Sequence, residues 1–149
     1  ITQNIDDLHE RAGSNQVLHL HGNIRLAKSS GPTAQFTQDF YPIEGWQLDL
    51  EHHRCAEGYP LRPHVVWFGE AVPNIEKAIA ITQSADLFVI VGTSMVVHPA
   101  ASLLLAVPYD VETVYIDTNP DVEEGINLLV IKEKATIGIK QLVNDFLPY

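Results

Sequence analysis

Hydrophobic residues in this chain fall into short continuous runs and into longer segments with helical spacing. A near-continuous apolar run predicts a strand that is covered on both faces at residues 86–92. Residues 113–117 predict another buried strand, and residues 127–131 predict a further short strand. Apolar positions recur at helical spacing at residues 73–84, 99–107 and 137–146. Strands that alternate with helices predict a parallel sheet with right-handed crossovers, so the pattern indicates the α/β class.

Two of the expected helices have a clear inward face. The first should bury Ile75, Ala78, Ile79 and Thr82, and the last should bury Ile139, Leu142, Val143 and Phe146.

The amino-terminal third of the chain is less regular. Residues 7–12 predict a short helix, with Asp6 or Asp7 as its N-cap. Residues 17–22 alternate between apolar and polar side chains, which predicts a strand. From Lys28 to Gly58 the periodicity is lost, and we expect a small insertion with little regular structure.

The stretch from Arg62 to Glu70 is the one around which the other elements are expected to be arranged. Its β-branched and aromatic residues favour extended structure, followed by a loop. Pro63 is expected only at the start of that strand, because proline cannot donate to a sheet ladder. Gly69 would let the backbone approach a ligand or another chain closely.

Composition narrows the class of protein. The 149 residues include 46% hydrophobic residues and carry a net charge of −10, which argues against nucleic acid as a direct partner. No apolar run reaches the roughly 20 residues of a membrane helix. The single cysteine, Cys55, fits a reducing cytoplasm. Because the chain begins at Ile1 without a methionine, we expect it to be a piece of a longer protein.

Polar side chains recur where the strands are expected to end, at Asn4, Asp6, His21, Glu70, Thr93, Ser94, Asp117 and Asn119. Hydroxyls, amides and carboxylates at strand ends suit a nucleotide, which binds at the carboxyl edge of a parallel sheet. His21 follows the expected strand directly and is the better candidate for chemistry, whereas His19 is expected to be structural. The chain contains no glycine-rich phosphate-binding motif.

Two other chemistries are disfavoured. Residues 92–96 begin like the nucleophile elbow of a serine hydrolase, but Val96 replaces the required glycine and no histidine follows His98. The cluster of His52, His53 and Cys55 suggests zinc, but a second pair of ligands is missing, so we interpret it as a polar loop.

Five blocks of sequence carry a resemblance to a known family: residues 2–6, 20–22, 62–70, 92–94 and 116–117. In this order they resemble the sirtuin family of NAD-dependent protein-lysine deacylases, and residues 62–70 are most similar to its bacterial members. The resemblance implies the carboxyl-terminal part of a Rossmann-like parallel sheet with helices on both faces. Residues 1–27 and 62–149 would form that domain, and residues 28–61 a small irregular insertion.

The resemblance also implies roles for individual residues. The catalytic residues would be His21, as the general base on the nicotinamide ribose, and Asn4. NAD would contact Gln3, Asn4, Ile5, Asp6, Gly92, Thr93, Ser94, Asp117, Thr118, Asn119 and Ala135. An acyl-lysine protein or peptide would pair as an added strand with Val66, Phe68, Gly69, Glu70 and Val97.

The chain departs from the family in two respects. Of the two cysteine pairs in the family's zinc module only Cys55 remains, with Arg54 and Glu57 near it, so we expect no zinc. The family's glycine-rich NAD loop would precede residue 1, so we expect this chain to be inactive alone. The alternative is a non-catalytic, incomplete nucleotide-binding domain that associates through an exposed sheet edge.

Overall fold

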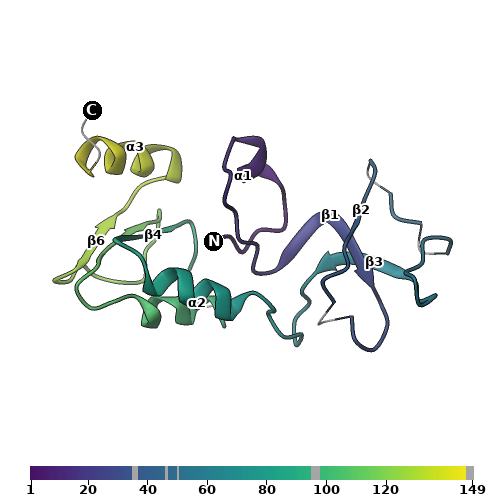
Figure 1. Cartoon of the computed structure of the whole chain (residues 1–149). Helices are drawn as coiled ribbons and strands as arrows, with labels where there is room; N and C mark the ends of the chain where they lie inside the picture. Colours follow the sequence, from purple (N-terminus) through teal and green to yellow (C-terminus); the bar gives the residue numbers. More distant parts are fainter. Residues whose placement is uncertain (35–36, 46, 50, 95–97, 147–149) are drawn as a thin grey trace. The chain divides into compact units, whose positions relative to one another are not determined.

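The computed structural model describes residues 1–34, 37–45, 47–49, 51–94 and 98–146. Its internal contacts divide the chain into two compact units, Ile1–Ala78 and Ile79–Tyr149 (Figure 1). Among the described residues, no helix combines the length and apolar character that crossing a lipid bilayer requires.

A parallel sheet forms the centre of the second unit, as the sequence predicted. Its strands have the order β4-β5-β6 and are β4 (Leu87–Val91), β5 (Glu112–Ile116) and β6 (Leu128–Ile131). Val91 pairs with Ile116, which pairs with Ile131, so the three strands end level with one another. The parallel order confirms the α/β class.

All three predicted helical segments contain a helix, with one change of type. They are α2 (Ile75–Gln83), η1 (Ala100–Ala106) and α3 (Ala135–Phe146). η1 is a 3₁₀ helix, a tighter form that is usually short. In α2 the expected face is correct, since Ala78 and Thr82 are buried and Glu76 is exposed.

Helix α3 packs on the sheet through a glycine. Val114, Ile116 and Leu142 form the buried core of this unit. Gly138, one helical turn before Leu142, is also buried, and a Cβ there would lie 2.4 Å from Ile116 Cγ2. The prediction that Ile139 points inward was wrong, because this residue is 37% exposed. The side chain of Phe146 lies outside what the structure describes.

The first unit contains an antiparallel sheet that the sequence did not predict. Its strands have the order β2-β1-β3 and are β1 (Gly22–Ser29), β2 (Tyr41–Pro42) and β3 (Leu61–Val65) (Figure 1). The span expected to be irregular begins within β1 at Lys28 and includes β2. The rest of it lies between β1 and β3. Its polar, aperiodic sequence concealed strands that are only partly buried.

The strand predicted at residues 17–22 is absent. Only an isolated parallel bridge joins Thr2 to His19, through Thr2 N–H to the Leu18 carbonyl and Leu20 N–H to the Thr2 carbonyl, both at 2.9 Å. The regular strand begins at Gly22, where φ is +90°. The predicted helix at residues 7–12 is shorter, α1 (Leu8–Arg11).

Pro63 lies inside β3 and not at its start, contrary to the prediction. The pairing register between β1 and β3 shifts between Asn23 and Ala27, and Ala27 is the partner of Pro63. Proline is tolerated at such an irregularity because no regular ladder bond is lost there. β3 ends at Val65, so Trp67 and Phe68 belong to the following turn and not to the strand.

Replacing Gly138 with Ala should destabilise the fold, although alanine normally favours a helix. The new methyl group must displace the Ile116 side chain, and overpacking of this kind costs about 1–3 kcal/mol. Chemical denaturation should show this loss. Gly125→Ala is the matched control, because its Cβ would lie at an ordinary 3.8 Å from Leu128. A Gly138→Ala protein as stable as the wild type would contradict this packing.

Candidate functional site

The His21 ring is held in one orientation by the backbone. Its Nδ1 lies 3.0 Å from the carbonyl oxygen of Gln3, and its own carbonyl accepts the N–H of Val66 at 2.9 Å. A carbonyl oxygen can only accept a hydrogen bond, so Nδ1 must carry the proton. In the neutral ring this leaves the lone pair on Nε2, which is the arrangement that a general base needs.

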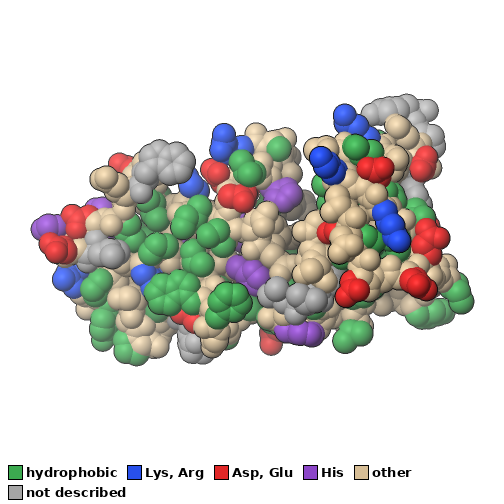
Figure 2. Space-filling model, turned by 180° about the vertical axis from the view of Figure 1, so that it is seen from behind, with side chains coloured by type: hydrophobic (Ala, Val, Ile, Leu, Met, Phe, Trp, Pro, Cys, Tyr) green, Lys and Arg blue, Asp and Glu red, His purple; other side chains and the backbone are tan. Residues whose placement is uncertain are grey.

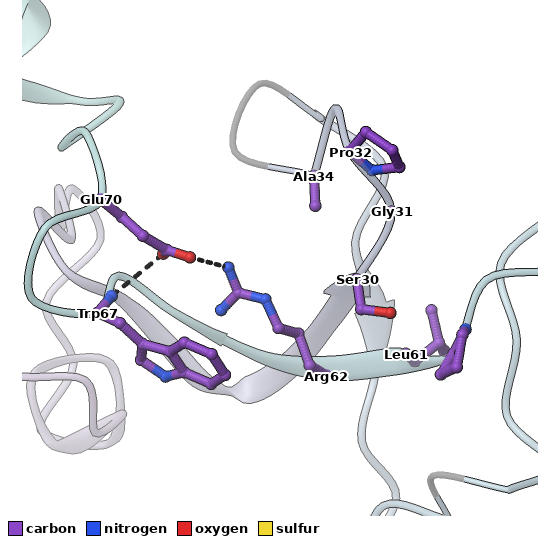
Figure 3. A pocket seen from close by; sticks show the side chains of 9 residues that line it. Ser30, Gly31, Pro32, Ala34, Leu61, Arg62, Trp67 and Glu70 are labelled. Carbon is purple, nitrogen blue, oxygen red and sulfur yellow. Dashed lines mark hydrogen bonds and ion pairs between the residues drawn. The ribbon is translucent and has the colours of Figure 1, made fainter.

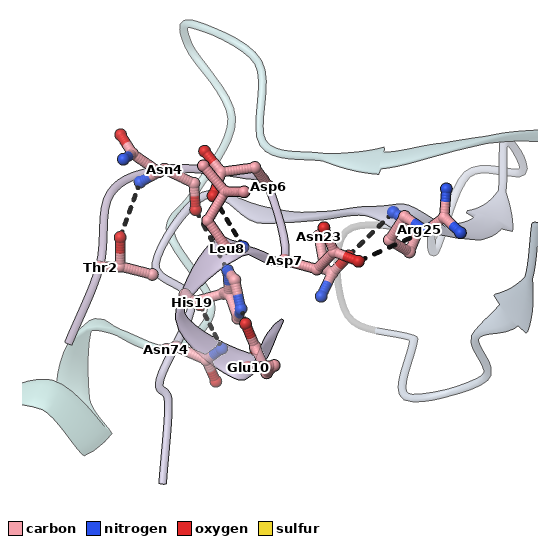
Figure 4. Close-up of polar contacts among 10 residues, drawn as sticks. All are labelled: Thr2, Asn4, Asp6, Asp7, Leu8, Glu10, His19, Asn23, Arg25 and Asn74. Carbon is pink, nitrogen blue, oxygen red and sulfur yellow. Dashed lines mark hydrogen bonds and ion pairs between the residues drawn. The ribbon is translucent and has the colours of Figure 1, made fainter. Parts of the chain in front are cut away.

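The loop at residues 2–6 is fixed mainly by hydrogen bonds to backbone atoms (Figure 4). The Asn4 N–H donates to the Thr2 hydroxyl at 3.1 Å, and Ile24 N–H donates to the Ile5 carbonyl at 2.7 Å. Asp6 Oδ1 accepts the N–H of Leu8 at 3.1 Å, while the N-cap position of α1 is Asp7, whose side chain makes no capping bond. The Asn4 side chain is left exposed at the surface.

His19 connects this loop to α1 (Figure 4). Its Nδ1 lies 3.1 Å from the Asn4 carbonyl and its Nε2 lies 2.7 Å from Glu10 Oε1. The His19 carbonyl accepts the side-chain amide of Asn74 at 2.8 Å. The hydrogen bond from His19 lowers the pKa of the Glu10 carboxyl. These contacts agree with the structural role expected for His19.

The turn at residues 66–70 is closed by Glu70 (Figure 3). Glu70 Oε1 pairs with the Arg62 guanidinium, and Oε2 accepts the Trp67 N–H at 3.1 Å. The Glu70 N–H in turn donates to the Trp67 carbonyl at 3.0 Å. Gly69 has a φ of +88°, which a residue with a side chain rarely adopts.

The same turn presents apolar side chains to solvent. Phe68 is fully exposed and Trp67 is 57% exposed. Figure 2 shows hydrophobic side chains gathered on the left of the view, over the part of the chain that carries β1, β2 and β3. An exposed apolar turn with a fixed backbone suits the binding of a peptide.

In the second unit, the polar residues at the strand ends lie at one edge of the sheet. Gly92 N–H donates to the Ile116 carbonyl at 3.0 Å, and Asp117 N–H donates to the Ile131 carbonyl at 3.2 Å. Asp117 Oδ1 accepts the Asn119 N–H at 2.9 Å. Helix α3 begins at Ala135, shortly after β6 ends.

The Tyr115 side chain is hydrogen-bonded to the loop at residues 92–94. Its hydroxyl donates to the Thr93 carbonyl at 2.6 Å. Burial, reinforced by the negative charges of Asp117 and Asp121, raises the pKa of Tyr115, so the hydroxyl stays protonated and can donate. The loop from Gly92 to Ser94 is thereby held at the strand end.

The predicted site residues fall into two groups. The first unit holds Gln3, Asn4, Ile5, Asp6, His21, Val66, Phe68, Gly69 and Glu70. The second unit holds Gly92, Thr93, Ser94, Asp117, Thr118, Asn119 and Ala135. Val97 lies outside the described residues. Sequence reasoning did not single out Lys28, because it placed this residue in a span expected to be irregular. It named Arg62 only as the start of a run.

Two of the pockets formed by described residues of the first unit are not lined by His21. One of about 520 Å³ is bounded by Pro32, Ala34 and Leu61 on one side and by Arg62, Trp67 and Glu70 on the other (Figure 3). The other, of about 740 Å³, includes Asp6 and Leu8 in its wall. The candidate base is therefore identified by the hydrogen bond at His21 and not by either of these two pockets.

The segment around Cys55 is held by hydrogen bonds to its side chain and backbone. The Ser29 hydroxyl bonds to the Cys55 side chain and lowers the pKa of its thiol. Backbone bonds close the hairpin, since Cys55 N–H donates to the Tyr59 carbonyl and Gly58 N–H to the Cys55 carbonyl, both at 2.9 Å. Within the described ranges, no three His, Cys, Asp or Glu side chains converge as metal ligands would.

His64 of β3 is held neutral by its surroundings, which include the cations Lys28 and Arg62. Its ring stacks on Phe40 with centroids 4.1 Å apart, and its Nδ1 is buried with no hydrogen-bond partner among the described residues. Burial first, and then the positive charges of Lys28 and Arg62, lower the pKa of His64 to about 4.

Comparison with known proteins finds relatives that match nearly the whole chain. A profile described as the Sir2 family matches residues 1–99. An NAD-dependent protein deacylase of Bacteroides thetaiotaomicron is 40% identical over 151 residues, which cover 99% of this chain and 64% of that protein. One from Helicobacter pylori is 45% identical over 145 residues, covering 96% of this chain and 60% of that protein. The chain thus spans about 60% of the length of these curated relatives.

Solved structures agree with this similarity. A Sir2 homolog–NAD complex matches with a TM-score of 0.78 and 34% identity, covering 96% of this chain and 56% of that chain. A Sir2–p53 peptide–NAD⁺ complex matches with a TM-score of 0.75 and 29% identity, covering 96% and 60%.

Lowering the pH should destabilise the first unit through His64. The pKa of His64 is about 4 in the fold and about 6.5 in an unfolded chain, so between these values only the unfolded state binds the proton. The free energy of unfolding should therefore fall as the pH drops from about 6.5 to about 4. Denaturation of the wild type and of His64→Phe at pH 7.5 and 5 measures this, and the variant should lose part of the pH dependence. His9→Gln, at an exposed site, is the control, and an unchanged pH dependence in His64→Phe would refute the assignment.

Proposed function

The chain belongs to the Sir2 family, and on that premise we propose that its protein removes acyl groups from lysine side chains in an NAD-dependent reaction. The observation that supports this most directly is the hydrogen bond between His21 Nδ1 and the Gln3 carbonyl. The bond fixes the tautomer in which Nε2 can take a proton. The names of the relatives and the NAD in a solved Sir2 homolog support the choice of cosubstrate.

In this proposal His21 is the general base. A neutral imidazole suits the removal of a hydroxyl proton at neutral pH. NAD, when bound, supplies the ribose carbon from which nicotinamide leaves and to which the acyl oxygen adds. Asn4, whose side chain is exposed and whose backbone is fixed by Thr2 and His19, would act beside His21.

The residues of both units have the chemistry that a dinucleotide needs. Gln3, Ile5 and Asp6 would contribute to the nicotinamide end from a loop held by backbone bonds. The loop residues Gly92, Thr93 and Ser94 would offer backbone N–H groups at a strand end. Hydroxyl, amide and carboxylate groups suited to ribose are found at Asp117, Thr118 and Asn119, with Ala135 at the start of α3.

The substrate in this proposal is an acyl-lysine protein or peptide. Val66, Phe68, Gly69 and Glu70 would form its wall, Val97 would also contact the peptide, and the peptide would bind by main-chain hydrogen bonds as an added strand. The exposed Phe68 and the fixed backbone of the turn support this arrangement. The p53 peptide in a solved Sir2 complex supports a peptide as the ligand.

The remaining proposals concern the protein's cellular location, its partners and its domain organisation. We place the protein in the cytoplasm, with basic, lysine-rich targets favoured by its net charge of −10 and nucleic acid disfavoured. Residues 28–61 would be an insertion into a Rossmann-like domain formed by residues 1–27 and 62–149. Self-association through a sheet edge is the behaviour expected of the alternative, a non-catalytic nucleotide-binding module.

Replacing His21 with Ala in the protein with its complete natural sequence should abolish most turnover. We expect deacylation of an acyl-lysine peptide to fall by at least roughly 100-fold, the usual contribution of a positioned base. NAD binding, measured by calorimetry, should remain. His9→Ala is the control, because His9 is exposed on α1. Near-normal turnover of His21→Ala would remove this residue from the mechanism, and absence of acyl-dependent nicotinamide release in the wild type would contradict the enzyme itself.

We also propose that the insertion folds without zinc. The Ser29–Cys55 contact and the backbone bonds of the hairpin support this. Purified protein should contain far less than one zinc per chain by elemental analysis, and a chelator should leave its melting temperature unchanged. One tightly bound zinc per chain would overturn the proposal.

A further inference from the structure

A buried lysine stands next to the turn that the proposed function assigns to the substrate. Lys28 lies near the end of β1 and is only 2% exposed. Its register partner across the sheet is Arg62 of β3, so two cations lie side by side. Lys28 Nζ is 4.0 Å from Glu70 Oε2, while Arg62 pairs with Glu70 Oε1.

Burying the Lys28 ammonium group beside Arg62 costs free energy unless the Glu70 carboxylate is present to offset it. Taking an ammonium group out of water is unfavourable, and a neighbouring guanidinium adds repulsion. Both effects, burial first, lower the pKa of Lys28, and only the charge of Glu70 acts in the other direction. Glu70 is therefore attracted by two cations from one sheet, which restricts where its carboxylate can lie.

Glu70 transmits this restraint to the backbone of the turn. Its Oε2, the oxygen nearest Lys28, accepts the Trp67 N–H at 3.1 Å. Arg62 adds a hydrogen bond to the Val65 carbonyl at 2.9 Å and lies over the Trp67 ring, 4.4 Å from its centroid. The turn is thus anchored at both ends by one charge cluster.

We propose that Lys28 is a positioning residue for substrate binding, acting through Glu70 on the turn at residues 66–70. The inference rests on the proposed function, since it concerns the same peptide wall. Lys28 touches no substrate in this view. Its removal would loosen the backbone that must present hydrogen bonds to the peptide, while NAD binding elsewhere would be unaffected.

Steady-state kinetics of the protein with its complete natural sequence test the role. Lys28→Met keeps the length of the side chain and removes its charge. We expect its KM for an acyl-lysine peptide to rise about tenfold, within the range of coupling in contacting charge networks. The KM for NAD should stay within about twofold of the wild type. Lys28→Arg should restore the peptide KM, and Lys77→Met, at an exposed site on α2, should have no effect.

A double-mutant cycle tests whether Lys28 acts through Glu70. In a Glu70→Gln background, which keeps an acceptor for the Trp67 N–H, Lys28→Met should cause little further change in the peptide KM. Independent, additive effects of the two substitutions would overturn the proposal. So would an unchanged peptide KM in Lys28→Met, or equal increases in both KM values together with a lowered melting temperature.

Hydrogen exchange gives a readout that does not require catalysis. In Lys28→Met the amides of Trp67 and Glu70 should exchange at least about fivefold faster, because their bonds lose the restraint on the carboxylate. The amides of β1 and β3 should be unchanged. Faster exchange throughout the small sheet, or none in the turn, would show that Lys28 has only a structural role. If the wild type lacks deacylase activity, the proposed function fails and this exchange pattern alone decides the role of Lys28.

Discussion

The hydrogen bond between the His21 ring and the Gln3 carbonyl is the constraint on which the candidate site depends. It can form because two backbone systems meet at this residue. Thr2 holds the loop through its bonds to Leu18 and Leu20, and the His21 carbonyl holds the N–H of Val66. The imidazole is therefore fixed between the expected cofactor loop and the expected substrate turn. The candidate base is thus held in a single tautomer by a backbone carbonyl at its Nδ1.

Strand β1 connects this residue to the charge cluster. It begins at Gly22, directly after His21, and passes through Lys28 before it ends at Ser29. Gly22 cannot be replaced without strain, because its φ is +90° and a Cβ would lie 2.0 Å from the His64 carbonyl oxygen of β3. The close approach of β1 and β3 thus begins beside the candidate base and continues to the pair of Lys28 and Arg62. The small sheet is part of the support of the site and not only an insertion.

The sequence predicted the second unit better than the first. In the second unit, strands of the parallel sheet are marked by continuous apolar runs, and β5 is buried along most of its length. In the first unit, β1 and β3 are only partly buried and carry Lys28, Arg62 and Pro63, so no period-two pattern identifies them. The motif residues could be chosen from the sequence, but the tautomer of His21 could not. It depends on Gln3, 18 residues away in the chain.

The bonds that the Glu70 carboxylate makes in the structure change the role expected for it in the site. The sequence placed it in the substrate wall, where a carboxylate would ordinarily attract a cationic group. In the structure one of its oxygens faces Arg62, and the other faces the Trp67 N–H and Lys28. Its charge is therefore already neutralised within the small sheet. What the turn offers to a ligand is the exposed apolar surface of Phe68, which suits an uncharged group better than a charged one. The net charge of −10 acts only at longer range and is separate from this local neutralisation.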